Sequence, residues 1–213
     1  MPIINPYKSS AKYPGSTKIA GMLDKPYLVK WANSLGKENI DVDEYVKETA
    51  KVGTLIHNLI EAFVMNEEVE QEIFKDFDDN EIKNAYNGLN KFKVWFNLHK
   101  IEPIFCEKKF ISETYKYVGI IDFYCKFDDK YTIIDFKTSK SISEEHLLQL
   151  SSYYQLLKEN ELEVDQVMIL NIPRDENIEF CSRTLLKEEQ KMYFDIFKKL
   201  LDIYYIKFDL DWS

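Results

Sequence analysis

The spacing of apolar residues along the chain predicts helices first and strands later. Over residues 43–65 the apolar positions recur every three or four residues, which predicts a helix with one buried face. A second helix follows an acidic loop and carries its apolar face on Ile82, Tyr86, Leu89, Phe92 and Phe96. Residues 1–40 mix Pro, Gly, Ser and Lys, and they predict an irregular arm leading into a short amphipathic helix over 23–35.

After residue 100 the apolar spacing becomes that of β-strands. We expect strands over 104–111, 117–127 and 131–136, with the last two joined by a tight polar turn. Ser141 and Glu144 have the spacing of a capping box, in which each side chain satisfies a free backbone donor at a helix start. The helix that they begin is expected to run to about Asn160.

The last third of the chain predicts a buried strand at 167–170, an edge strand at 178–183 and a long amphipathic helix over 185–208. The whole order describes an α+β fold in which helices pack on a central mixed β-sheet. We expect one domain, with an arm and short helix at 1–42 that belong to the same unit as 43–213.

Composition limits the class of protein. A chain of 213 residues with 45% hydrophobic content can bury a core without disulfides or a structural metal. Its apolar runs are too short to cross a bilayer and its start lacks a signal-peptide pattern, so we expect a soluble protein with no membrane partner. Three scattered cysteines without a CxxC pair indicate reduced structural thiols: Cys106, Cys125 and Cys181.

The net charge of the chain is -9, which by itself argues against a nucleic-acid partner. The distribution of charge changes that conclusion, because the first forty residues hold six lysines against only Asp24 and Glu38. This N-terminal segment is available to bind phosphates, although an ordinary solvated surface explains it equally well.

Two carboxylates, Asp122 and Asp135, appear at the ends of adjacent predicted strands that are otherwise apolar. A buried, unpaired carboxylate is costly, so a cation should lie between them. Lys137 points to the same face as Asp135, because side chains alternate along a strand. The arrangement suits a divalent cation with oxygen ligands and an ammonium group beside the water it activates. By itself, Asp135 with Lys137 is more often a surface ion pair, because the pattern D-x-K is common by chance.

Two helices carry further candidates. Gly53, His57 and Glu61 lie one turn apart on one face, and Gly53 permits close approach to the sheet. Without other evidence, His57 is more often a packed core residue than a metal ligand, and Glu61 is an ordinary solvated glutamate. Gln149 and Tyr153 share a face distinct from the core stripe, where they can bind a phosphate or form a partly exposed polar edge.

In this order, the motifs resemble the RecB-like branch of the PD-(D/E)XK nuclease superfamily, whose pattern is GxxxH, GxxD, DxK and QxxxY. The matching pairs are Gly53 with His57, Gly119 with Asp122, Asp135 with Lys137, and Gln149 with Tyr153. Residues 13–17 and 28–32 are also similar to the entry segment of the mitochondrial genome maintenance exonucleases and related phage exonucleases. The resemblance implies a restriction-endonuclease-like core.

The resemblance also implies the roles of the site residues. The metal ligands would be His57, Asp122, Asp135 and the backbone carbonyl of Phe136, with Glu61 and Glu107 as further candidates. Lys137 would orient or help deprotonate the attacking water. Gln149 and Tyr153 would shape the site and contact the substrate backbone. The expected cofactor is Mg²⁺ or Mn²⁺, and no iron-sulfur cluster is expected, because three scattered cysteines are an incomplete ligand set.

The function expected from this resemblance is an exonuclease that acts on DNA ends, single-stranded ends included, in recombination, repair or phage DNA processing. Its location would be the cytoplasm of a bacterium or phage-infected cell, and the sequence does not identify a protein partner. A structure-specific endonuclease is the nearest alternative, since the same metal site serves both. A catalytically silent DNA-binding protein with the same fold is a further alternative.

Overall fold

The computed structural model describes residues 13–174 and 178–209. They form one five-stranded sheet in the order β1-β2-β3-β4-β5. Its strands are β1 (Ile101–Ser112), β2 (Tyr117–Phe127), β3 (Lys130–Lys137), β4 (Gln166–Asn171) and β5 (Cys181–Thr184). Only β3 and β4 run parallel, and the other neighbours are antiparallel. The predicted mixed sheet and α+β class are therefore confirmed.

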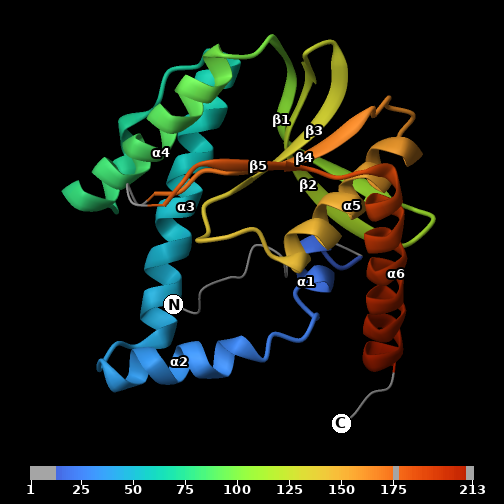
Figure 1. Cartoon of the computed structure of the whole chain (residues 1–213), viewed down its shortest axis with the longest axis horizontal. Helices are drawn as coiled ribbons and strands as arrows, with labels where there is room; N and C mark the ends of the chain where they lie inside the picture. Colours follow the sequence, from blue (N-terminus) through green and yellow to red (C-terminus); the bar gives the residue numbers. More distant parts are fainter. Residues whose placement is uncertain (1–12, 175–177, 210–213) are drawn as a thin grey trace.

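The helices are α1 (Ser16–Ala20), α2 (Tyr27–Lys37), α3 (Val42–Met65), α4 (Asp79–Asn97), α5 (Glu144–Glu159) and α6 (Lys187–Asp209), with a short 3₁₀ helix, η2 (Gln71–Phe74). Helices α3 and α4 cover one face of the sheet, and α5 and α6 cover the other (Figure 1). Among the described residues, no helix is both long and apolar enough to cross a membrane.

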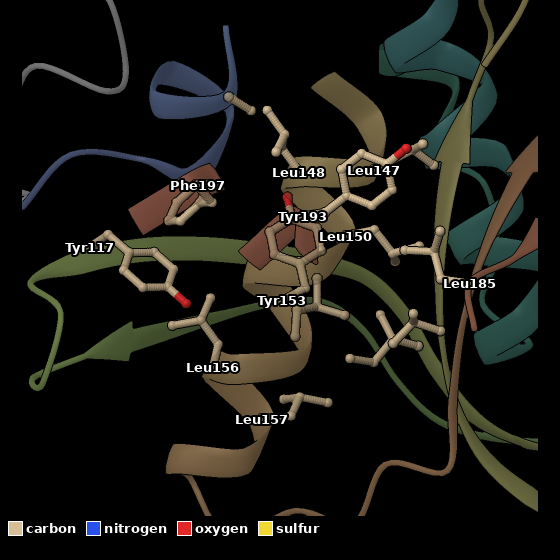
Figure 2. Close-up of a cluster of buried hydrophobic side chains, with 14 of the residues drawn as sticks. Tyr117, Leu147, Leu148, Leu150, Tyr153, Leu156, Leu157, Leu185, Tyr193 and Phe197 are labelled. Atoms are coloured by element: carbon tan, nitrogen blue, oxygen red, sulfur yellow. The ribbon is translucent and has the colours of Figure 1, made fainter. Parts of the chain in front are cut away.

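Two apolar clusters hold these layers together. On one face, α3 and α4 pack on aromatic strand residues such as Phe123 and Phe136. On the other face, α1, α5 and α6 pack on β2, and Figure 2 shows the leucines of α5 with Tyr117, Tyr193 and Phe197. Because α5 is enclosed by the sheet, α1 and α6, it is buried nearly all round rather than along one stripe.

The helix α5 begins later than its predicted capping box. Its N-cap is Ser143, whose backbone N–H donates to Nδ1 of His146 at 3.2 Å. The predicted capping box of Ser141 with Glu144 is therefore wrong, since the N-cap lies two residues later and its partner is His146. The carbonyl of Ser141 instead accepts a hydrogen bond from the Ser139 hydroxyl within the preceding loop. Glu144 lies in the first helical turn, where its negative charge interacts favourably with the helix dipole.

The buried face of α4 differs from the predicted one at Tyr86, which is 41% exposed. The helix buries Ala85 and Gly88 instead, and a Cβ on Gly88 would lie 3.0 Å from Cδ1 of Ile56 on α3. Small residues thus allow α3 and α4 to approach closely. Tyr86 lies at the rim, stacked on Phe74.

The N-terminal segment contains more structure than the predicted arm. Ile19 and Ala20 of α1 are buried in the core on the α5 side. In contrast, α2, described over its whole length, buries none of its side chains and lies away from the sheet, between α1 and α3 (Figure 1). Residues 1–12, part of the predicted arm, lie outside the described residues. The three cysteines are free thiols.

Candidate active site

The carboxylates of Asp122 and Asp135 lie where the pairing of β2 with β3 stops. The last paired residues are Phe123 and Ile134. Just beyond them, Oδ2 of Asp122 accepts a hydrogen bond from the backbone N–H of Phe136 at 2.8 Å. A side chain therefore continues the ladder in place of a strand carbonyl. Asp122 lies inside β2 and not at its end, so the two strands separate at the candidate site while β2 continues.

Asp135 is fully buried beside Lys137. Its Oδ2 lies 2.7 Å from Nζ of Lys137. Neither carboxylate oxygen accepts a hydrogen bond of good geometry from the residues that the structure describes. Burial raises the pKa of Asp135 and the Lys137 ammonium opposes this. Burial alone would lower the pKa of Lys137, but Asp135 and Asp122 together raise it. This buried, underpartnered carboxylate suits a further positive charge.

His57, Glu107 and Asp122 form a compact group on the adjoining side of Asp122. Their ligand atoms all lie within 4.8 Å of one another. Nδ1 of His57 is 3.6 Å from Oε1 of Glu107 and 3.9 Å from Oδ2 of Asp122. Burial alone would lower the pKa of His57, but Asp122 and Glu107 outweigh it and raise the pKa. Two carboxylates and one imidazole are a donor set that fits a divalent cation.

Glu107 belongs to this group although its backbone conformation is unusual. It lies opposite Asp122, between the pairs Cys106–Phe123 and Lys108–Ile121 of the β1–β2 ladder. Its φ is 46°, in the left-handed region that non-glycine residues rarely adopt. Such strain costs about 1–2 kcal/mol and is often found at functional sites. In the sequence Glu107 was only a minor candidate, because nothing there indicates the positive φ.

Glu61 and Phe136 flank the group. Glu61 is half-buried, and burial together with the Glu107 charge raises its pKa, but it is not in the compact group. Phe136 places its ring in the apolar cluster on the α3 side, and its N–H is the donor to Asp122. The expected roles of Glu61 and of the Phe136 carbonyl stay predictions.

Gln149 and Tyr153 of α5 join the same site from the other side. Nζ of Lys137 donates to Oε1 of Gln149 at 3.0 Å, and Nε2 of Gln149 donates to the Tyr153 hydroxyl at 2.6 Å. Both side chains are buried, so they do not form an exposed polar edge. Nε2 of Gln149 also donates to Oγ1 of Thr17 at 3.0 Å. Thr17 was absent from the predicted site because its hydroxyl meets α5 only in the folded chain.

Two glycines allow these elements to approach. A Cβ on Gly53 of α3 would lie 2.7 Å from Oγ1 of Thr138, the residue after Lys137. A Cβ on Gly119 of β2 would lie 2.7 Å from Cε1 of Tyr153 and 2.6 Å from Cδ1 of Leu156. Larger residues would push α3 and α5 away from the strands that carry the carboxylates. The expected close approach at Gly53 is thus to the segment that follows β3.

The N-terminal lysines are only partly free for a ligand. Lys18 donates to the Tyr204 hydroxyl at 3.2 Å, and Lys25 pairs with Glu145. Lys30 and Lys37 are exposed on α2. Lys8 and Lys12 lie outside the described residues.

Comparisons with known proteins identify a family and a likeness in fold to solved structures. The sequence model of the PD-(D/E)XK nuclease superfamily matches residues 27–198. The crystal structure of a "putative exonuclease" from Eubacterium rectale has a TM-score of 0.50 and 8% identity, covering 70% of this chain and 64% of that one. The chain therefore spans less than two thirds of that protein, and at this identity the likeness concerns the fold alone.

A second solved structure, named SSO0001, has a TM-score of 0.34 and 14% identity, covering 76% of this chain and 87% of its own. The likeness is too weak to support an argument. The search of curated proteins found no match.

Proposed function

The chain belongs to the PD-(D/E)XK nuclease superfamily, and we propose that it is a metal-dependent deoxyribonuclease of the RecB-like branch that degrades DNA from its ends. The observation that carries this proposal is the ion pair of the buried Asp135 with Lys137, next to the group of His57, Glu107 and Asp122. A silent DNA-binding relative would have no need to keep a costly buried carboxylate with its lysine.

The residues divide into two roles. His57, Asp122 and Glu107 would hold a divalent cation, with Asp135 beside them. Mg²⁺ or Mn²⁺ bound there would withdraw charge from the phosphoryl oxygens and lower the pKa of a coordinated water. Lys137 contacts Asp135 and Gln149, and it would orient the attacking water and donate a hydrogen bond to it. The imidazole of His57 must lose its proton to become a ligand, so protons compete with the cation.

The DNA would reach this site through a few cationic contacts. The net charge of -9 opposes general attraction to phosphate. Lys30 and Lys37 on α2, and Lys109 on β1 two residues from Glu107, are exposed. We expect a shallow salt dependence, since each phosphate contact on a single strand contributes about 0.7 to the slope. The setting would be recombination, repair or phage DNA processing.

The experiment compares end-labelled linear and circular DNA, single- and double-stranded, with Mg²⁺, Mn²⁺ or EDTA. We expect metal-dependent release of short products from linear DNA, with single-stranded DNA a good substrate. Asp122→Ala should serve as the inactive control. Cleavage of circular DNA would instead favour the structure-specific endonuclease. No cleavage with either metal would overturn the proposal.

A further inference from the structure

A chain of hydrogen bonds joins the N-terminal helix to Lys137. Oγ1 of Thr17, on α1, accepts from Nε2 of Gln149, and Oε1 of Gln149 accepts from Nζ of Lys137, both at 3.0 Å. Nζ of Lys137 in turn lies 2.7 Å from Oδ2 of Asp135. One exposed threonine is therefore two hydrogen bonds away from the lysine of the candidate site.

The chemistry of the groups fixes how the Gln149 amide is turned. An ammonium can only donate, so the side of the amide facing Lys137 must be its oxygen. The NH₂ side then faces two hydroxyl oxygens, those of Thr17 and Tyr153, and it has two hydrogens to donate. If either acceptor is lost, one buried hydrogen of Gln149 loses its partner. Rotation of the amide can give this hydrogen a new acceptor, but the rotation would take Oε1 away from Lys137.

The position of Thr17 is set by β2. Gly15 bridges to Val118, and Val118 N–H donates to the Pro14 carbonyl at 2.9 Å. The hydroxyl of Ser16 donates to the Val118 carbonyl at 3.1 Å. This segment pairs with the part of β2 that β3 leaves free, shortly before Asp122. Helix α1 also packs on α5, the helix that carries Gln149 (Figure 2).

We propose that Thr17 is a positioning residue, whose hydroxyl holds the Gln149 amide so that Oε1 keeps the Lys137 ammonium beside Asp135. This inference rests on the proposed function, because its effect is expressed in phosphodiester hydrolysis. Thr17 acts through Gln149 and not as a ligand or nucleophile. Thr17 is exposed and belongs to neither apolar cluster, so we expect its substitution to leave the apolar core in place.

The test compares three variants with the wild-type protein. Thr17→Val keeps the shape and removes the hydroxyl, whereas Thr17→Ser keeps the acceptor. Thr184→Val is the matched control, an exposed threonine on the edge strand β5. For each protein, kcat and KM on single-stranded DNA are measured with Mn²⁺. The Gln149 side-chain NH₂ resonances, assigned with a Gln149→Met sample, are followed by NMR without metal.

For Thr17→Val we expect kcat to fall about tenfold with KM changed less than about twofold, because misplacement of a catalytic group acts on the transition state. The Gln149 NH₂ resonances should shift, and Thr17→Ser should restore both properties. A rise in KM with kcat unchanged would overturn the inference, since Thr17 would then bind substrate. Unchanged kcat and resonances in an active enzyme would also overturn it. A wild-type protein without cleavage would instead refute the proposed function, while the NMR comparison would still test the hydrogen-bond chain.

Discussion

The carboxylate of Asp122 accepts a hydrogen bond from the backbone N–H of Phe136 at 2.8 Å, where the ladder between β2 and β3 has just ended. The same oxygen, Oδ2, faces Nδ1 of His57 at 3.9 Å. Asp122 therefore closes the end of a strand pair and also belongs to the candidate metal group. Its two roles can be separated by choosing substitutions that keep one of them.

Asp122→Asn keeps an acceptor for the Phe136 N–H and removes the charge, whereas Asp122→Ala removes both. We expect both variants to lose tight Mn²⁺ binding and cleavage, because a charged oxygen ligand is gone. Only the alanine variant should also lose about 1–3 kcal/mol of stability, since it leaves a backbone donor unsatisfied. Calorimetric Mn²⁺ titration and chemical denaturation measure the two effects. Wild-type Mn²⁺ affinity in either variant would exclude Asp122 as a ligand.

Lys137→Ala should lower kcat by orders of magnitude with DNA affinity nearly intact, because the ammonium acts beside the attacking water. Lys137→Arg should not restore turnover, since guanidinium is too broad for the space between Asp135 and Gln149. Lys140→Ala, which removes an exposed lysine three residues later, is the control and should keep full activity. Turnover above about a tenth of the wild-type value in Lys137→Ala would contradict this role.

Glu107→Gly should make the protein more stable and less active. Glycine adopts a φ of 46° without strain, so the metal-free protein should gain up to about 1 kcal/mol. The loss of the carboxylate should weaken Mn²⁺ binding at the same time. Glu107→Gln separates the two effects, because it should weaken Mn²⁺ binding while the backbone strain stays. If the glycine variant is no more stable by thermal denaturation, the strain at Glu107 is compensated elsewhere.

His146→Gln should make the protein less sensitive to acid. Burial, Lys137 and Lys25 lower the pKa of His146 to about 3, below the usual histidine value of 6.5. The unfolded chain therefore binds a proton between these values that the folded protein does not. The contribution of neutral His146 to the free energy of unfolding is fully present above about pH 6.5. It is lost progressively as the pH falls towards about 3.

Glutamine at this position can still accept from the Ser143 N–H, as in an ordinary capping box, but it does not titrate. We expect urea midpoints of wild type and His146→Gln to be similar at pH 7.5 and to diverge at pH 4.5, with the variant more stable. Parallel pH profiles would show that His146 does not contribute to acid sensitivity.

Local patterns in the sequence were enough to predict most of the fold. The helical spacing over 43–65 and the apolar run over 117–127 correspond to α3 and β2. Helix α3 buries one face, whereas β2 lies between helices on both faces of the sheet and contributes to both apolar clusters. The order of Gly53, His57, Asp122, Asp135 and Lys137 was also sufficient to indicate a nuclease. Two predictions failed. The start of α5 was placed at Ser141, but the cap is Ser143 with His146 as its partner. On α4, Gly88 packs on Ile56 and Tyr86 is exposed, a result of helix packing that the spacing of apolar residues does not show.

Only the tertiary structure decided which groups meet. Glu107 joins His57 and Asp122 because a positive φ and the β1–β2 register bring it opposite Asp122, and neither is encoded in a short motif. Thr17 meets Gln149, 132 residues away, because the segment before α1 pairs with the free edge of β2. Sequence spacing describes neighbours along one helix or strand. The pairing of separate elements depends on packing across the whole sheet, and that packing brings the Thr17 hydroxyl to the Gln149 amide.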